Sequence, residues 1–103
     1  MNVVNVYTTY MKIETKGLKI IEDKPGCLAY DCEGMYYIEL KAGTVASDHI
    51  HEEPETIYLV SGTARVEIDN QIQEFTGPVK FTLPGGIHHK VSAITDSIAL
   101  EVK

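Results

Sequence analysis

The sequence lacks a long hydrophobic run, a cluster of basic residues and a helical apolar repeat. No apolar stretch approaches the roughly 18–20 residues of a membrane span, and residues 1–16 lack the basic start and apolar core of a signal peptide. Only 9 Lys and Arg face 15 Asp and Glu, giving a net charge of −6 and no basic patch for nucleic acid or an anionic membrane. We therefore expect a cytoplasmic protein with no nucleic-acid or membrane partner.

Cysteine is also scarce. The chain has two, Cys27 and Cys32. In one extended strand their Cα atoms would lie roughly 16 Å apart, too far for a disulfide. We expect both to be reduced thiols, and we assign them no redox or metal role.

The length and composition describe one folded domain. With 103 residues, 44% hydrophobic and 23% charged, the chain is long enough for one packed core and far from the composition of a disordered protein. The sequence shows no linker and no internal repeat. We predict a single domain over residues 1–103.

What the sequence does contain is alternation of apolar and polar residues at period two, clearest over Thr63–Asp69. Turn residues such as Pro84-Gly85-Gly86 interrupt these runs about every 8–12 residues, a spacing typical of β-sandwiches and barrels. An all-β fold with little or no helix is predicted. The expected strands are Val3–Tyr10, Leu18–Ile21, Leu28–Asp31, Met35–Lys41, Thr56–Val60, Thr63–Asp69, Val79–Leu83, Lys90–Ala93 and Ile98–Val102.

The four histidines fall in two pairs, and none lies in the first 48 residues. In the first pair, His49 and His51 are two residues apart, so an extended backbone projects both side chains to one face. Pro54 cannot sit in a central ladder, so we expect the chain to bend there and Glu55 to begin the next strand. A carboxylate can then join the two imidazoles.

In the second pair, the alternation groups His89 with apolar Val91 and His88 with charged Lys90, which predicts that His89 points inward. Neutral imidazole nitrogen and carboxylate oxygen suit one divalent Fe, Mn, Co, Ni, Cu or Zn ion. Four such ligands leave one or two positions on an octahedral ion for water, substrate or dioxygen. The predicted metal ligands are His49, His51, Glu55 and His89.

This pattern resembles the cupin family. Its first motif is Gly, five residues, His-x-His, three or four residues, Glu, six residues, Gly, and it is matched by Gly43, His49, His51, Glu55 and Gly62. The centre of the second motif is matched by Pro84, Gly86 and His89. Two positions depart from the second motif, because six residues instead of five separate Gly77 from Pro84 and because Ala93 stands where the family has Asn.

The resemblance implies a jelly-roll β-barrel with a metal inside it, built from the first motif at 43–62, the second at 77–93 and N-terminal strands over 1–42. It also implies a homodimer in which an N-terminal strand, here Val3–Tyr10, joins the partner's sheet. Ile57 and Leu59 share the face of Glu55 and are expected to wall the metal. Aromatic candidates for the cavity, each with core or interface as its favoured role, are Tyr36, Tyr37, Tyr58 and Phe81.

Three functions remain open at this level. We place first a dioxygenase-like, metal-dependent enzyme acting on a small oxygen-bearing organic molecule inside the barrel. The alternatives are a redox-neutral isomerase or lyase, in which the ion acts as a Lewis acid, and a non-catalytic module that binds a small molecule or metal. Every inward histidine is expected to be a ligand, which argues against the metal-free epimerase chemistry found elsewhere in the family.

Overall fold

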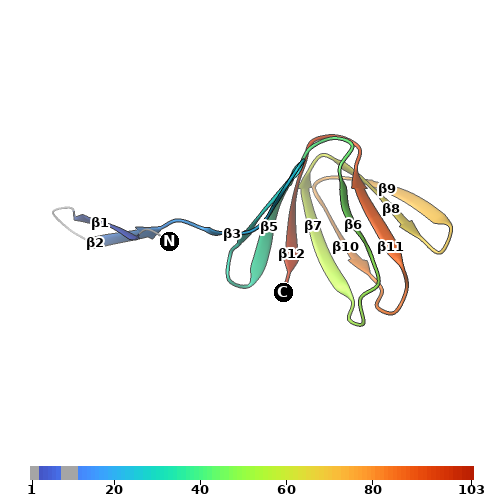
Figure 1. The fold of residues 1–103 in the computed structure, drawn as a ribbon, viewed down its shortest axis with the longest axis horizontal. Helices are drawn as coiled ribbons and strands as arrows, with labels where there is room; N and C mark the ends of the chain where they lie inside the picture. Colours follow the sequence, from blue (N-terminus) through green and yellow to red (C-terminus); the bar gives the residue numbers. More distant parts are fainter. Residues whose placement is uncertain (1–2, 8–11) are drawn as a thin grey trace.

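Twelve β-strands make up the part of the chain that the computed structural model describes, residues 3–7 and 12–103 (Figure 1). These residues include no helix of the length and hydropathy needed to cross a membrane. The strands are Val3–Tyr7 (β1), Lys12–Lys16 (β2), Lys19–Lys24 (β3), Cys27–Asp31 (β4), Met35–Leu40 (β5), Val45–His49 (β6), Glu55–Ser61 (β7), Thr63–Ile68 (β8), Gln71–Thr76 (β9), Val79–Leu83 (β10), His89–Ala93 (β11) and Ser97–Val102 (β12).

Two antiparallel sheets enclose the core. The larger has the order β10-β7-β12-β5-β4-β3 and the smaller β6-β11-β8-β9, so strands distant in the sequence lie side by side, as in a jelly roll. Leu83 is 2% exposed, and full burial of such a side chain stabilises the fold by about 1.5–3 kcal/mol. Both inner faces contribute to the main core cluster, which consists of Leu59, Ala64, Val66, Phe81, Leu83, Val91 and Ala99.

The expected all-β fold is confirmed, and each expected run overlaps a strand, although Leu18–Ile21 covers only the first half of β3. The run predicted over Val3–Tyr10 is described as β1 to Tyr7, and residues 8–10 lie outside the described residues. Alternation does not predict β2, β6 or β9, because polar residues dominate their sequences. In β9 every residue but Phe75 is exposed, so the strand has no buried face that would require alternating apolar residues.

The hairpin formed by β1 and β2 extends away from the barrel (Figure 1). The two strands pair with each other, and within the described residues no ladder joins them to either sheet of the barrel. The molecule measures 59 × 27 × 24 Å and its radius of gyration is 16.4 Å, whereas about 13 Å is expected for a compact chain of this length. The projecting hairpin accounts for this elongation.

Candidate metal centre

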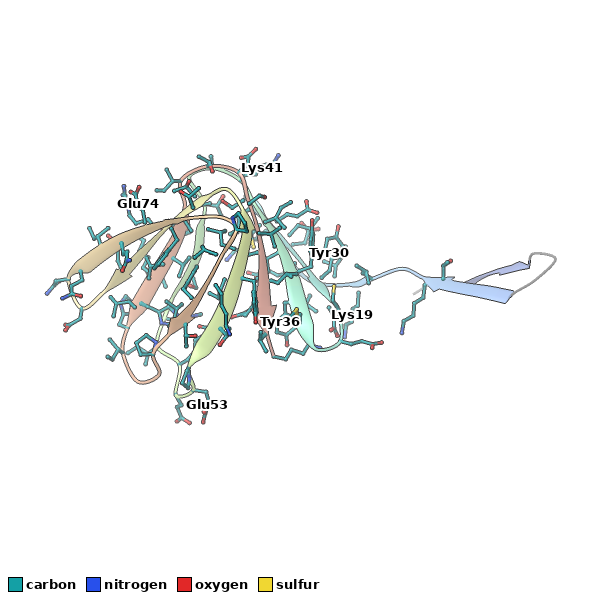
Figure 2. The ribbon with its side chains drawn as sticks, turned by 180° about the vertical axis from the view of Figure 1, so that it is seen from behind. Lys19, Tyr30, Tyr36, Lys41, Glu53 and Glu74 are labelled. Atoms are coloured by element: carbon teal, nitrogen blue, oxygen red, sulfur yellow. The ribbon has the colours of Figure 1, made fainter. Side chains whose placement is uncertain are left out.

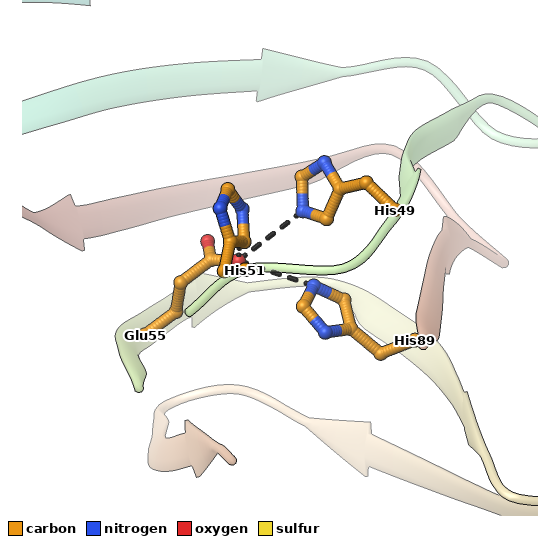
Figure 3. Close-up of side chains that lie close together, drawn as sticks. All are labelled: His49, His51, Glu55 and His89. Carbon is orange, nitrogen blue, oxygen red and sulfur yellow. Dashed lines mark hydrogen bonds and ion pairs between the residues drawn. The ribbon is translucent and has the colours of Figure 1, made fainter. Parts of the chain in front are cut away.

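The four predicted ligands lie close together (Figure 3). His49 is the last residue of β6 and His89 the first of β11, and the two residues lie directly opposite each other in the antiparallel ladder. Glu55 is the first residue of β7, as the bend at Pro54 predicts. His51 lies in the loop after β6, and its ring centroid is still only 3.8 Å from that of His49.

A glycine turn holds the His51 loop in place. The Gly86 N–H donates a hydrogen bond of 2.6 Å to the His51 carbonyl oxygen. A Cβ atom on Gly85 would lie 2.2 Å from the Glu52 carbonyl oxygen, so no larger residue fits there without displacing the backbone. The turn before β11 therefore packs against the loop after β6, and it fixes His51 relative to His89.

The three histidines aim their Nε2 atoms at one carboxylate oxygen. Glu55 Oε1 lies 3.2 Å from His49 Nε2, 2.7 Å from His51 Nε2 and 3.1 Å from His89 Nε2, and all four ligand atoms lie within 4.8 Å of one another. Bonds of about 2.1 Å at right angles around an ion place neighbouring ligand atoms about 3.0 Å apart. The three separations from Glu55 Oε1 are close to this value, and the cluster could hold a metal ion.

Burial favours the neutral imidazole that a metal requires. His89 is 1% exposed, and the close contact of its Nε2 atom is with Glu55 Oε1 at 3.1 Å. Burial lowers the pKa of His89, and the neighbouring His49 and His51 lower it further. Burial and His51 likewise lower the pKa of His49.

His88 points away from this cluster, as the alternation predicts. Its Nε2 atom lies 2.6 Å from Asp48 Oδ1, and both side chains are more than half exposed. The two adjacent histidines thus differ completely in environment, with His88 on the outside and His89 inside. This difference makes His88 a matched control for experiments on the cluster.

A largely apolar cavity of about 160 Å³ adjoins the cluster and has His49 and Glu55 in its wall. Ile57 and Leu59 also line it, in agreement with the expectation that they wall the site. A larger open groove of about 520 Å³ lies along β3, β4, β5 and β12, but none of the four predicted ligands lines it. The small interior cavity is therefore the candidate binding site.

Of the four aromatic candidates for the cavity, one lines it. Phe81 is in the cavity wall, where its ring stacks on Phe75 with centroids 4.6 Å apart. Tyr58 alternates with inward-facing Leu59 and so lies on the outer face of the larger sheet. The structure does not place Tyr36, Tyr37 or Tyr58 in the cavity wall.

Sequence reasoning missed one acidic residue, Glu101 on β12. It lies opposite Ile57 in the ladder between β12 and β7, so it faces the barrel interior and lines the cavity. Burial, followed by a hydrogen bond with Glu55 and the charge of that carboxylate, raises the pKa of Glu101 to about 7. The signal was present, because Glu101 is two residues from the buried Ala99 and shares its face.

The fold and the site together define a cupin. The family model for the cupin domain matches residues 36–102, and the chain belongs to this family. The match covers all four residues of the cluster and also Glu101.

Comparison with solved structures finds the same fold in other proteins. KdgF from Halomonas sp. is 21% identical, with a TM-score of 0.66 over 81% of this chain and 82% of that one. An RmlC-like cupin from Shewanella frigidimarina is 20% identical, with a TM-score of 0.67 over 82% and 80%. These two likenesses show the fold.

Oxalate decarboxylase from Bacillus subtilis is 26% identical with a TM-score of 0.66, but the match covers 82% of this chain and 26% of that one. The chain therefore spans about a quarter of the decarboxylase. A comparison with curated proteins found no match.

Proposed function

We propose that this cupin is a metal-dependent, dioxygenase-like enzyme that acts on a small oxygen-bearing organic molecule in the barrel. The observation that carries the proposal is the convergence of three Nε2 atoms on Glu55 Oε1, beside a cavity of about 160 Å³. His49, His51, Glu55 and His89 would hold the ion. Four protein ligands leave room on a six-coordinate ion for substrate and dioxygen.

A redox-active ion such as Fe(II) would supply the chemistry that activates dioxygen. If both oxygen atoms enter the product by oxidative cleavage of a carbon–carbon bond, the substrate supplies all four electrons and no external reductant is consumed. The chain's own contribution is to bind and orient. Ile57, Leu59 and Phe81 wall the cavity with apolar atoms, which exclude water and strengthen polar interactions at the ion.

The test is oxygen uptake by Fe(II)-loaded protein in an electrode chamber with a panel of phenols and diketones. We expect uptake with at least one substrate, loss of uptake in His51→Ala, and unchanged uptake in His88→Ala. If neither oxygen uptake nor product appears across a broad panel, while elemental analysis shows the protein to be fully loaded, the oxygenase proposal is wrong.

A redox-neutral lyase or isomerase is the second candidate. The observation that favours it is the similarity to oxalate decarboxylase, whose description names Mn(II) centres. In this case the ion would act as a Lewis acid on a substrate oxygen, and turnover would persist without oxygen and with Zn²⁺ or Mn²⁺. Ligand-induced thermal stabilisation without turnover in either assay would instead support a non-catalytic binding module.

We also propose that the protein is a homodimer, as the resemblance implies. The hairpin of β1 and β2 supports this, since an isolated two-stranded hairpin is only marginally stable in water. Edge strand β3 continues from it, with Ile20 50% and Ile21 44% exposed. Lys19 and Tyr30 lie on the side of the barrel from which the hairpin extends (Figure 2). A second copy that pairs with this hairpin and covers this side would bury both features.

A further inference from the structure

The ladder between β6 and β11 places a hydroxyl group in the cavity wall. It begins with the pair of His49 and His89. The next pair whose side chains face inward is Ser47 and Val91, and Val91 is 6% exposed in the main core cluster. Asp48, between Ser47 and His49, has a side chain that is more than half exposed. Ser47 therefore shares the inner face of β6 with His49, and it lines the cavity.

A β-bulge shapes the wall at this point. Beside the pair of Ser47 and Val91 the register of the ladder shifts, and Ala46 is the extra residue on β6. Strict alternation would turn Ala46 to the outer face together with Asp48. In the structure both Ala46 and Ser47 line the cavity, and bulges that re-aim a side chain in this way are common next to active sites. The two small side chains leave space next to the Ser47 hydroxyl for a group of a ligand.

The Ser47 hydroxyl is available to a ligand. It is the only hydroxyl among the described residues that line the cavity, and no hydrogen bond joins it to another described residue. A hydroxyl both donates and accepts hydrogen bonds, so it can hold a hydroxyl or a carbonyl group. The carboxyl groups in the wall all come from strands of the larger sheet, across the cavity from Ser47, and they belong to Glu22, Glu55 and Glu101.

The size of the cavity and the spacing along β6 define the shape of the ligand. A volume of about 160 Å³ is close to the roughly 150 Å³ that holds a benzene molecule in an apolar protein cavity. Two residues of strand separate the Cα atoms of Ser47 and His49 by about 6.6–6.8 Å, a span that a substituted six-membered ring can bridge. Ile57 and Phe81 provide apolar contacts for the ring.

We propose that Ser47 is a specificity-determining residue that binds a polar group on the far side of a ring-sized substrate. The oxygens at one end of the substrate face the metal centre, and a hydroxyl or carbonyl group at the other end forms a hydrogen bond with Ser47. A substrate with an apolar group at that end leaves the serine hydroxyl unpaired in the wall. The inference rests on the proposed function, since it requires an ion held by the histidines and Glu55.

The test measures binding to Zn²⁺-loaded protein by calorimetry without oxygen, because a redox-inert ion separates binding from turnover. The probes are benzene-1,2,4-triol and 4-methylcatechol, which present the same two adjacent hydroxyls to the ion but carry a hydroxyl or a methyl group on the far side of the ring. Wild type is compared with Ser47→Ala, which removes the serine hydroxyl, and with Ser47→Thr, which keeps a hydroxyl. Ser92→Ala removes a hydroxyl from the outer face of the neighbouring strand β11 and is the control. The zinc content of each protein is measured by elemental analysis.

Wild type should bind the triol more tightly than 4-methylcatechol, and Ser47→Ala should reduce this preference by about 2–10-fold, as the loss of one neutral hydrogen bond predicts. Ser47→Thr and Ser92→Ala should keep the preference. An equal preference in wild type and zinc-loaded Ser47→Ala overturns the inference and leaves the metal centre standing, and so does a zinc-loaded wild type that binds neither probe. Loss of zinc from Ser47→Ala alone also overturns it, since the hydroxyl would then support the metal centre. A wild type that takes up no zinc refutes the proposed function itself, and the inference with it.

Discussion

If the cluster holds a metal ion, replacing His89 by alanine should remove about two-thirds of the stability that metal binding adds to the protein. His89 is 1% exposed, and its Nε2 atom is one of the three that converge on Glu55 Oε1. Removing a residue that hydrogen-bonds to a metal ligand typically weakens metal binding by about 10–100-fold. Removing a ligand itself should therefore weaken metal binding by at least about 100-fold. The structure offers no other imidazole on that side to replace it, because His88 is turned outward to Asp48.

The magnitude follows from linkage between binding and folding. Free metal at about 1,000 times the dissociation constant stabilises the wild type by about 4.1 kcal/mol. If the site binds 100-fold more weakly, the same free metal is only ten times the dissociation constant, and the stabilisation falls to about 1.4 kcal/mol. At about 4–8 °C per kcal/mol for a small domain, the metal-induced rise in Tm should fall from about 16–33 °C to about 6–11 °C.

The assay compares the Tm of each protein with Zn²⁺ and after treatment with a chelator. Taking the difference within each protein cancels any loss of stability from the cavity that the substitution leaves. His88→Ala removes the same side chain one position away and should show the full wild-type increment. An equal increment in His89→Ala and wild type would refute the assignment of His89 as a ligand.

Three further predictions concern the fold, the acid behaviour and the assembly. Leu83→Ala, in the core at 2% exposure, should lower the free energy of unfolding by about 2–5 kcal/mol in urea titrations; a loss below about 1 kcal/mol would contradict the packing described. In the metal-free protein, burial holds the pKa of His89 below 6.5, so as the pH falls the unfolded chain binds a proton at this residue before the folded protein does. The stability that neutral His89 contributes above pH 6.5 is therefore lost progressively below pH 6.5. Glu101 has the opposite effect on stability, because its raised pKa lets the folded protein bind more protons than the unfolded chain between about pH 7 and 4.5. The effect of His89 is therefore isolated by comparing urea unfolding of wild type and His89→Gln at pH 7.5 and 5.5. The variant should lose less stability on acidification than wild type, and equal losses would contradict the prediction. Light scattering should give the full chain a mass near twice 11.4 kDa, and it should give a protein that lacks residues 1–17 the mass of a monomer. If the shortened protein is still a dimer, the hairpin does not hold the two copies together.

Much of the site could be predicted from the sequence because its geometry is local. A His-x-His pair on extended backbone, a proline before Glu55 and alternation around His89 each place one side chain, and the structure brings these four together. The all-β class follows from the same alternation. These signals act over a few residues, so they survive without knowledge of how the sheets pack.

The alternation of apolar and polar residues could not predict which strands lie side by side in a sheet. Glu101 reaches Glu55 only because β12 lies beside β7, although the two strands are far apart in the sequence. Strands β6 and β9 also could not be predicted from alternation. Strand β6 is held by its ladder with β11 and strand β9 by its ladder with β8, and neither sequence shows an apolar face.

The hydrogen bond from the Gly86 N–H to the His51 carbonyl ties together the two segments that carry His51 and His89. Opening this turn would release both histidines in one step, so an ion in the site should leave by local unfolding of the turn and not by loss of one ligand at a time. The Gly86 amide then becomes a reporter of occupancy. If the cluster binds a metal ion, hydrogen exchange at this amide should slow by the same factor by which the ion shifts the opening equilibrium toward the closed turn, so one amide proton would report the affinity of the site.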